Sequence, residues 1–477
     1  MELFFYKGKE NILESKKEQS TEQSELKKMQ DSFLKVLDNK NLSFLLGSGC
    51  SSYETEIEVK EGTPEENIQE HAEAEQTEGQ QSDKSETKDS NTENQSKIEK
   101  VQIGIPIMAP IAEEFYNSEE FNDEKKWLKE ELGIDVTDST FSTNLETFLS
   151  TLHSLSFYHS KISKPKLEES EKKLMEEETN SKEFKNLGDF EKIDFIIKKA
   201  RNFLLQKCLN EDKSKSGKDF ELIELYKQLY RKLLSRNSTL PRLNIFTTNY
   251  DLYSERAMDL LGIHYVNGFT GGISKFFNPA IFNYALAEKM DLSQSKWSVI
   301  DNFFYLYKLH GSVNWIQATG DNKLFNVKEI QEPTFEKLKG KETIMIHPTP
   351  LKYNASLGSP YSDLFREFQK KLMQNNNILV TLGYSFSDEH INNLIFQAFT
   401  IPSFRLIVIG KPTESNAIGK LQNLNDSRIW IIGGKDDSAI PLHYFKRFVE
   451  EIMPDLTAED LDKKMETTIN TLKDLLK

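Results

Sequence analysis

Cysteine is scarce in this sequence of 477 residues, which contains only Cys50 and Cys208. Two thiols supply neither a disulfide framework nor a four-thiolate zinc site, and the chain has no CxxC pair. We therefore expect a protein of the reducing cytoplasm that holds no zinc and needs no other metal.

Long apolar runs and excess positive charge are also lacking. No apolar run reaches the roughly 20 residues of a transmembrane helix, and the apolar start of the chain lacks the core and cleavage site of a signal peptide. Acidic residues outnumber basic ones by 76 to 61, which gives a net charge of -15. Binding to nucleic-acid backbones depends on Lys and Arg. We therefore expect a soluble protein that binds neither membranes nor nucleic acid directly.

Aromatic residues are absent from residues 54–102, where Glu, Gln, Ser, Lys, Asn and Thr predominate. Such a segment buries too little apolar surface to offset the entropy lost on ordering. We predict that 54–102 is a disordered acidic insertion.

Short apolar runs of strand length alternate with helical patterns along the rest of the chain. This alternation predicts an α/β fold, Rossmann-like and doubly wound, with a mainly parallel sheet. Apolar residues at helical spacing between about 143 and 235 predict an inserted helical subdomain. The strand candidates are 42–46, 243–247, 304–309, 344–347, 378–382, 406–409 and 429–432.

The domain organisation follows from these patterns. We expect an N-terminal helical segment at 1–40, an α/β domain at 41–410, and a C-terminal strand with helices at 411–477.

Polar motifs directly follow four of the predicted strands. They are Gly-Ser-Gly-Cys-Ser at 47–51, Thr-Thr-Asn-Tyr-Asp at 247–251, Lys-Leu-His-Gly-Ser at 308–312 and Gly-Tyr-Ser-Phe-Ser-Asp at 383–388. Ligands of doubly wound sheets lie beyond the carboxyl ends of the strands. The glycines of the first motif permit close approach of a phosphate, although a plain tight turn has the same composition.

Taken together and in this order, the four motifs resemble the sirtuin family, with its GAGxS phosphate turn, TQNxD segment, catalytic LHG and late GxS. The resemblance covers residues 42–409 outside the acidic insertion. The tract GYSFSDEHINN at 383–393 is more similar to the divergent bacterial branch than to the deacylases.

The resemblance implies that NAD is bound as a substrate. His310 would act as general base, and Asn249 and Asp251 would flank the nicotinamide and its ribose. The remaining residues that it assigns to NAD binding are Gly47, Ser48, Gly49 and Ser51 for the pyrophosphate, Gly383 and Ser385 for the adenosine half, and Thr248.

Two departures from the family bear on activity. No cysteine follows Cys208, so the zinc ribbon that helps to form the acyl-lysine groove of the deacylases is missing. The family's GIPDFR segment is Gly-Ile-Pro-Ile-Met-Ala at 104–109, which puts Ile107 where the family has an aspartate. The first change favours water over a peptide as the acceptor. The second removes the side chain that would hold the nicotinamide carboxamide, a role for which Asn249 and Asp251 could compensate.

We therefore expect an NAD hydrolase that releases nicotinamide and ADP-ribose, similar to the NAD-depleting effectors of bacterial antiphage systems. The alternative is a non-catalytic module that senses NAD or ADP-ribose and controls assembly. A protein deacylase or ADP-ribosyltransferase is disfavoured by the missing zinc ribbon.

Control of such an enzyme is expected to come from outside the chain. We expect a homo-oligomer, with a HerA-type ATPase as a possible partner suggested by the resemblance. Apolar stripes at 26–37 and 445–475 are candidate contact surfaces, with packing inside the chain as the alternative.

Four other residues leave two interpretations open or favour a structural role. His347 follows a predicted strand and is either a pocket residue or a structural one, and His390 is better explained by helix capping or packing. Cys50 fits its turn by size, and Trp315 is a core anchor or a wall of the pocket.

Overall fold

The computed structural model describes residues 3–14, 22–59, 97–162, 184–211, 219–291, 296–318, 326–345, 358–436, 438 and 440–455. The chain divides into two compact units, Met1–Tyr53 with Gly104–Lys477, and Glu54–Ile103. In the described ranges, no helix is both long enough and apolar enough to span a membrane.

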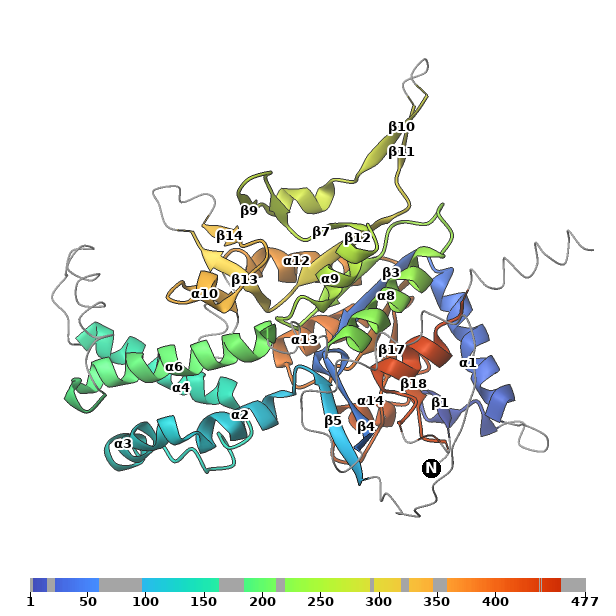
Figure 1. Cartoon of the computed structure of the whole chain (residues 1–477). Coiled ribbons are helices and arrows are strands. Elements are labelled where there is room, and N and C mark those ends of the chain that lie inside the picture. Colours follow the sequence, from blue (N-terminus) through green and yellow to red (C-terminus); the bar gives the residue numbers. More distant parts are fainter. Residues whose placement is uncertain are drawn as a thin grey trace, which may run out of the picture. The chain divides into compact units, whose positions relative to one another are not determined.

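A nine-stranded sheet forms the centre of the larger unit (Figure 1). Neighbouring strands from β18 to β7 are all parallel, while β1 and β2 are antiparallel additions at one edge. In spatial order the strands are β2 (Glu10–Asn11), β1 (Phe4–Lys7), β18 (Ile429–Gly433), β17 (Arg405–Ile409), β16 (Asn377–Leu382), β3 (Asn41–Leu46), β6 (Asn244–Thr247), β12 (Phe303–Lys308) and β7 (His264–Val266).

The central strands are buried along their whole length, as their apolar sequences predict. The mainly parallel α/β sheet expected from the sequence is thus confirmed. The N-terminal segment is not purely helical, however, because Phe4, Phe5 and Tyr6 pair with β18 in the sheet. Its apolar run is too short to show a strand period, so only the pairing partner reveals it.

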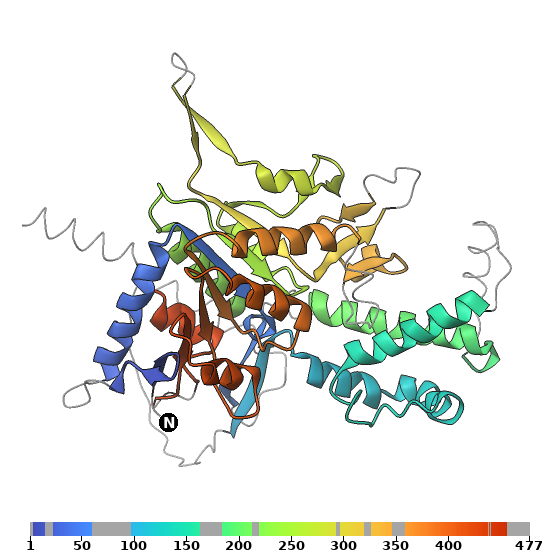
Figure 2. The same cartoon turned by 180° about the vertical axis from the view of Figure 1, so that it is seen from behind.

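Helices cover both faces of the parallel sheet, as the opposite views of Figures 1 and 2 show. On one face lie α8 (Phe220–Leu234) and α9 (Tyr253–Leu260), and on the other α12 (Tyr361–Leu372) and α13 (Glu389–Ala398). The ring of Tyr230 in α8 contacts Phe304 of β12, whereas Phe368 of α12 contacts Phe246 of β6. Apolar stripes on both layers therefore hold the sheet as its core.

The helices expected between 143 and 235 are α4 (Leu145–Ile162), α6 (Asp189–Leu209) and α8. Helix α4 packs on α6, and both contact α2 (Met108–Asn117), whereas α8 packs on α9 against the sheet. All of them belong to the same compact unit as the sheet. Other described helices are α3 (Asn122–Leu132), α10 (Phe335–Leu338), and the short 3₁₀ helices η2 (Ser48–Cys50), η4 (Glu119–Phe121), η5 (Phe184–Asn186) and η6 (Pro279–Asn283).

An antiparallel five-stranded sheet includes the strand that directly follows His310. Its order is β15 (Thr343–Met345), β13 (Gly311–Gln317), β14 (Val327–Glu329), β9 (Lys275–Phe277) and β8 (Phe269–Thr270). The strand expected at 344–347 belongs to this sheet and not to the parallel one, and His347 lies outside the described residues. Trp315 is a core anchor, since it is buried against Phe269. A separate hairpin joins β10 (Ala287–Asp291) to β11 (Lys296–Val299).

The ends of the acidic insertion are strands, which corrects the prediction of disorder for them. β4 (Ser52–Val59) and β5 (Lys97–Gly104) form a two-stranded sheet. Thr55, Ile57 and Val59 alternate with glutamates, and this period of two is a strand signal that the polar composition concealed. Residues 60–96 lie outside the described part of the chain.

The two apolar stripes proposed as contact surfaces pack against each other. In α1 (Glu22–Leu37), the ring of Phe33 lies 5.4 Å from that of Phe448 in the π-helix η7 (Phe448–Ile452). The stripe residues of α1, α15 (Phe445–Arg447) and η7 are buried. They pack inside the chain, which is the alternative that the sequence left open for these stripes, and the expected homo-oligomer stays a prediction. The short α14 (Ala417–Asn423) precedes β18, and residues 456–477 lie outside the described part.

Candidate functional site

The loops that follow β16, β3, β6 and β12 meet at one edge of the parallel sheet. These four strands are consecutive neighbours and run in the same direction. From β3 the chain crosses to β6 on one side, and it later returns to β16 on the other side. The topological switch of the sheet therefore lies between β3 and β16, which is where doubly wound folds bind ligands.

A pocket of about 300 Å³ opens at this switch, within the size range of small-molecule sites. Most of the predicted site residues line it. They are Ser48, Ser51, Thr248, Asn249, Asp251, His310, Gly383 and Ser385. The other two, Gly47 and Gly49, do not line it.

The glycine turn after β3 packs directly on the turn after β16. The amide N–H groups of Gly47 and Gly49 donate to the carbonyl oxygens of Leu382 and Gly383, at 2.8 and 3.0 Å. A Cβ atom on Gly47 would lie 2.5 Å from the Gly383 oxygen, and one on Gly383 would lie 2.7 Å from the Cys50 nitrogen. These glycines are thus needed for contact between the two backbones. Their amide groups serve this contact, and the cradling of a pyrophosphate by Gly47 and Gly49 stays a prediction.

Asn249 links the loop after β6 to the turn after β3. Its amide donates to the Gly47 carbonyl at 2.9 Å and to Ser51 Oγ at 2.8 Å, and Ser51 Oγ donates to Asp251 Oδ2 at 2.5 Å. All three side chains are nearly buried. The motifs that lie about 200 residues apart therefore form one hydrogen-bonded unit on the pocket wall.

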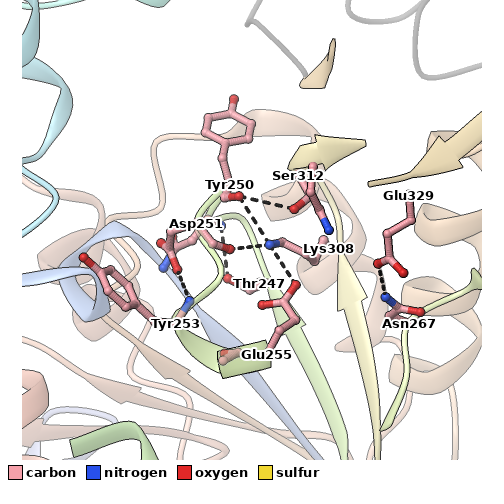
Figure 3. Close-up of polar contacts among 12 residues, drawn as sticks. Thr247, Tyr250, Asp251, Tyr253, Glu255, Asn267, Lys308, Ser312 and Glu329 are labelled. Carbon is pink, nitrogen blue, oxygen red and sulfur yellow. Dashed lines mark hydrogen bonds and ion pairs between the residues drawn. The ribbon is translucent and has the colours of Figure 1, made fainter. Parts of the chain in front are cut away.

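A buried lysine holds the loop after β6 in place (Figure 3). Lys308 Nζ donates to the carbonyl oxygens of Tyr250 and Asp251 and lies 3.0 Å from Glu255 Oε1. Lys308 is only 1 % exposed. Burial raises the pKa of Glu255, while the positive charge of Lys308 opposes that rise. The lysine of the Lys-Leu-His-Gly-Ser motif therefore stabilises the loop after β6, a structural role that the sequence did not indicate.

His310 faces a carboxylate across the pocket. Its Nε2 lies 2.9 Å from Asp388 Oδ2, and both side chains are largely buried. The ring N–H is not aligned with this oxygen, so the contact has the distance of a hydrogen bond without its geometry. Asp388 also accepts the backbone N–H groups of His390 and Ile391 and so caps α13. The helix cap expected around His390 is present. The side chain that forms it is Asp388, which also contacts His310.

Helix α4 contributes a second carboxylate that the sequence analysis missed. Glu146 and Asn144 line the pocket, and Tyr250 Oη donates to Glu146 Oε1 at 3.2 Å. Burial raises the pKa of Tyr250, with the Glu146 charge adding to the rise. Glu146 lies roughly a hundred positions from the nearest later motif, so no local spacing could have shown its place in the site.

Apolar side chains from α2, its preceding loop and α6 form the opposite wall. They are Ile105, Pro106, Ile107, Met108, Ile111 and Leu204. Ile107, which stands where the sirtuin pattern has an aspartate, lines the pocket and is 48 % exposed. An unpaired apolar side chain on a pocket wall is suited to contact the face of a ligand ring.

Neither cysteine has the properties of a nucleophile. Burial raises the pKa of both the Cys50 and the Cys208 thiol, with the charge of Asp251 acting in the same direction. Cys50 donates to the Leu382 carbonyl in the packed turn. Reactive cysteines are instead partly exposed and have lowered pKa values.

The pocket is acidic. Glu146, Asp251 and Asp388 line it together with His310, and none of the described residues adds a Lys or Arg side chain to its walls. Such a set can stabilise positive charge that develops on a bound ligand and can accept a proton. Within the described ranges, no three His, Cys, Asp or Glu side chains gather into a metal-binding group.

Comparison with known families agrees with this geometry. Residues 243–414 match the family model of the SIR2-like domain, so the chain contains a sirtuin-like domain. This family includes NAD-dependent enzymes. The match includes Asn249, His310 and Gly383 but not the turn at 47–51. No curated protein matches the chain.

Proposed function

We propose that this protein hydrolyses NAD to nicotinamide and ADP-ribose. The observation that carries the proposal is the meeting of Asn249 and His310 in one pocket at the switch point of a sirtuin-like sheet. The acidic walls and the SIR2-like match both support NAD as the ligand.

The chemistry is a displacement at the ribose carbon that bears nicotinamide. The bond from this carbon to the nicotinamide nitrogen breaks, and its electron pair leaves with nicotinamide. The oxocarbenium-like ribose that develops is positively charged, and Asp251 and Glu146 provide the negative charge that lowers its energy. The oxygen of a water molecule then bonds to the carbon, and His310 accepts the proton that this water loses.

Water is favoured as the acceptor because the chain has no cysteine after Cys208 and so lacks the zinc ribbon that helps to form the acyl-lysine groove of the deacylases. Ser48, Thr248, Ser385 and Ser387 offer hydroxyl groups for the phosphates and ribose hydroxyls. These groups support a binding mode in which the reacting carbon lies next to Asp251 and Glu146.

Product analysis in ¹⁸O-labelled water tests the proposal. We expect one labelled oxygen in ADP-ribose for each nicotinamide released. The Asn249→Ala variant should be at least about a hundredfold slower, the scale for losing one positioned polar group. The His264→Ala variant is the control, because His264 is exposed and outside the pocket. Cyclised ADP-ribose, or label-free transfer to a protein, would contradict hydrolysis.

A non-catalytic sensing module is the second candidate, and one observation favours it. The Asn249 amide is already committed to Gly47 and Ser51. A residue that only shapes the binding site would look the same. Saturable NAD binding by calorimetry without nicotinamide release would support this alternative.

A role as an antiphage effector is a further part of the proposal and rests on the resemblance alone. We expect that infected cells with the wild-type protein lose NAD, whereas cells with His310→Ala keep it. Equal NAD levels in both cultures after infection would argue against this role.

A further inference from the structure

We infer that Asp388 is the positioning residue of His310 and that it keeps a proton on Nε2 of the imidazole. The inference starts from the 2.9 Å separation of Nε2 and Asp388 Oδ2. A bare imidazole nitrogen and a bare carboxylate oxygen would repel each other at this distance, because both carry lone pairs. Attraction at this distance needs a proton on Nε2, although the ring N–H is not aligned with the carboxylate oxygen.

The carboxylate cannot easily turn away, because its other oxygen is fixed. Asp388 Oδ1 accepts the backbone N–H groups of His390 and Ile391 at 2.9 and 3.3 Å. The loop before it is held as well, since Asn392 donates to the Phe386 carbonyl and accepts from Tyr384 Oη. Asp388 thus presents Oδ2 to His310 from a rigid support.

Other charged groups near His310 are directed elsewhere. Lys308, two residues earlier, points to Glu255 and to the carbonyls of Tyr250 and Asp251. The Tyr250 ring lies 6.4 Å from the imidazole, and its hydroxyl donates to Glu146. Of the described carboxylates, Asp388 is the one in direct contact with the imidazole.

The consequence for chemistry concerns which ring nitrogen reacts. With the proton held on Nε2, the lone pair of the neutral ring is on Nδ1, and this atom accepts the proton of the attacking water. Asp388 then stabilises the imidazolium that forms. This step rests on the proposed function, whereas the position of the proton in the resting protein does not.

The Asp388→Asn variant separates this role from helix capping. Asn caps helices as well as Asp does. To accept the two backbone N–H groups, its oxygen must face α13, which turns its NH₂ group toward His310. That group donates, so the neutral imidazole must carry its proton on Nδ1 instead.

The experiment is ¹⁵N NMR of the full chain with labelled histidine, at about pH 8.5, where imidazoles of ordinary pKa are neutral. The chain has eight histidines, and the signal of His310 is the one lost in His310→Gln. We expect the proton on Nε2 in the wild type and on Nδ1 in Asp388→Asn. The control is Glu389→Gln, which removes the adjacent exposed carboxylate and should leave the signal unchanged.

Kinetics give the second readout. We expect Asp388→Asn to lower kcat for NAD by roughly 10² to 10⁴, with a change in KM under about threefold. The same tautomer in the wild type and in Asp388→Asn would overturn the inference, and so would an unchanged kcat in an active enzyme. If the wild type releases no nicotinamide, the proposed function fails, while the NMR result still decides the role of Asp388.

Discussion

Two sides of the same pocket are held by different forces. On the side of β3 and β16, backbone touches backbone, and Gly47, Gly49 and Gly383 leave no space for a Cβ atom. On the side of β6 and β12, buried polar side chains support the loop, with Lys308 and Glu255 at the centre. A Cβ atom added on the first side would clash with backbone atoms. On the second side, removing one member of the buried Lys308–Glu255 pair would leave the other without its partner. The comparison shows that motifs of one site can be constrained for opposite physical reasons.

The side of the pocket formed by β6 and β12 should lose more stability on substitution than the other side. Lys308→Met leaves Glu255 as a buried charge without its cation, so we expect a loss of about 3 to 5 kcal/mol in the free energy of unfolding. Urea denaturation measures this loss. The double variant Lys308→Met/Glu255→Leu should recover much of it, because no buried charge is then left alone. A loss below about 1 kcal/mol for the single variant would show that the pair is not a support.

Substitutions on the side formed by β3 and β16 should cause the second-largest loss in the free energy of unfolding. Gly383→Ala introduces a Cβ atom 2.7 Å from the Cys50 nitrogen at a φ of +59°. We expect a loss of about 2 to 4 kcal/mol from strain and overpacking together. Gly133→Ala is the matched control, since Gly133 has a φ of +67° and no atom within 4 Å of the added Cβ. It should cost only the conformational part, about 1 to 2 kcal/mol. Equal losses in the two variants would mean that the contact of the turns is unimportant.

A titrating group outside both walls should contribute less. His153 in α4 is partly buried, and burial lowers its pKa to about 4, with Arg201 adding to the shift. The folded pKa lies below the ordinary 6.5, so the unfolded state binds the proton first as the pH falls from 6.5 toward 4. Stability is therefore lost in that window, by about 1 to 2 kcal/mol between pH 7 and pH 5. His153→Gln should reduce this loss in thermal unfolding at the two pH values, and an identical pH dependence would exclude it as the cause.

Removing the Asn249 hydrogen bonds that link the two sides should have the smallest effect on stability. Asn249→Ala removes the donors to the Gly47 carbonyl and Ser51 Oγ, but the carbonyl still accepts from the Cys50 N–H, and Ser51 still donates to Asp251. We expect a loss of about 1 kcal/mol in urea unfolding. A loss as large as that of Lys308→Met would make Asn249 a structural residue first.

The sequence predicted the strands of the parallel sheet except β7, and most of the pocket, because both depend on local patterns. An apolar run followed by a polar motif marks the carboxyl end of a buried strand, and four such motifs converge as expected. The antiparallel sheet that contains β13 was missed, since β8, β9 and β14 are only two or three residues long. Strands of that length carry no measurable period.

The missing parts of the site have a common cause. Glu146 is brought in by a helix from an earlier part of the chain, and the support from Lys308 depends on Glu255, which is buried in the first turn of α9. Asp388 stood in a recognised motif, yet its contact with His310 joins loops after two strands that are not neighbours. Pairings of this kind are set by the tertiary fold.

The central claim is that His310 acts as a proton acceptor for NAD hydrolysis in this pocket. The most direct test is nicotinamide release from NAD by purified wild-type protein and by His310→Ala, with folding of both checked by thermal unfolding. We expect release by the wild type and a rate at least about a hundredfold lower in the variant at nearly unchanged stability. Release by a folded His310→Ala protein at the wild-type rate would contradict it.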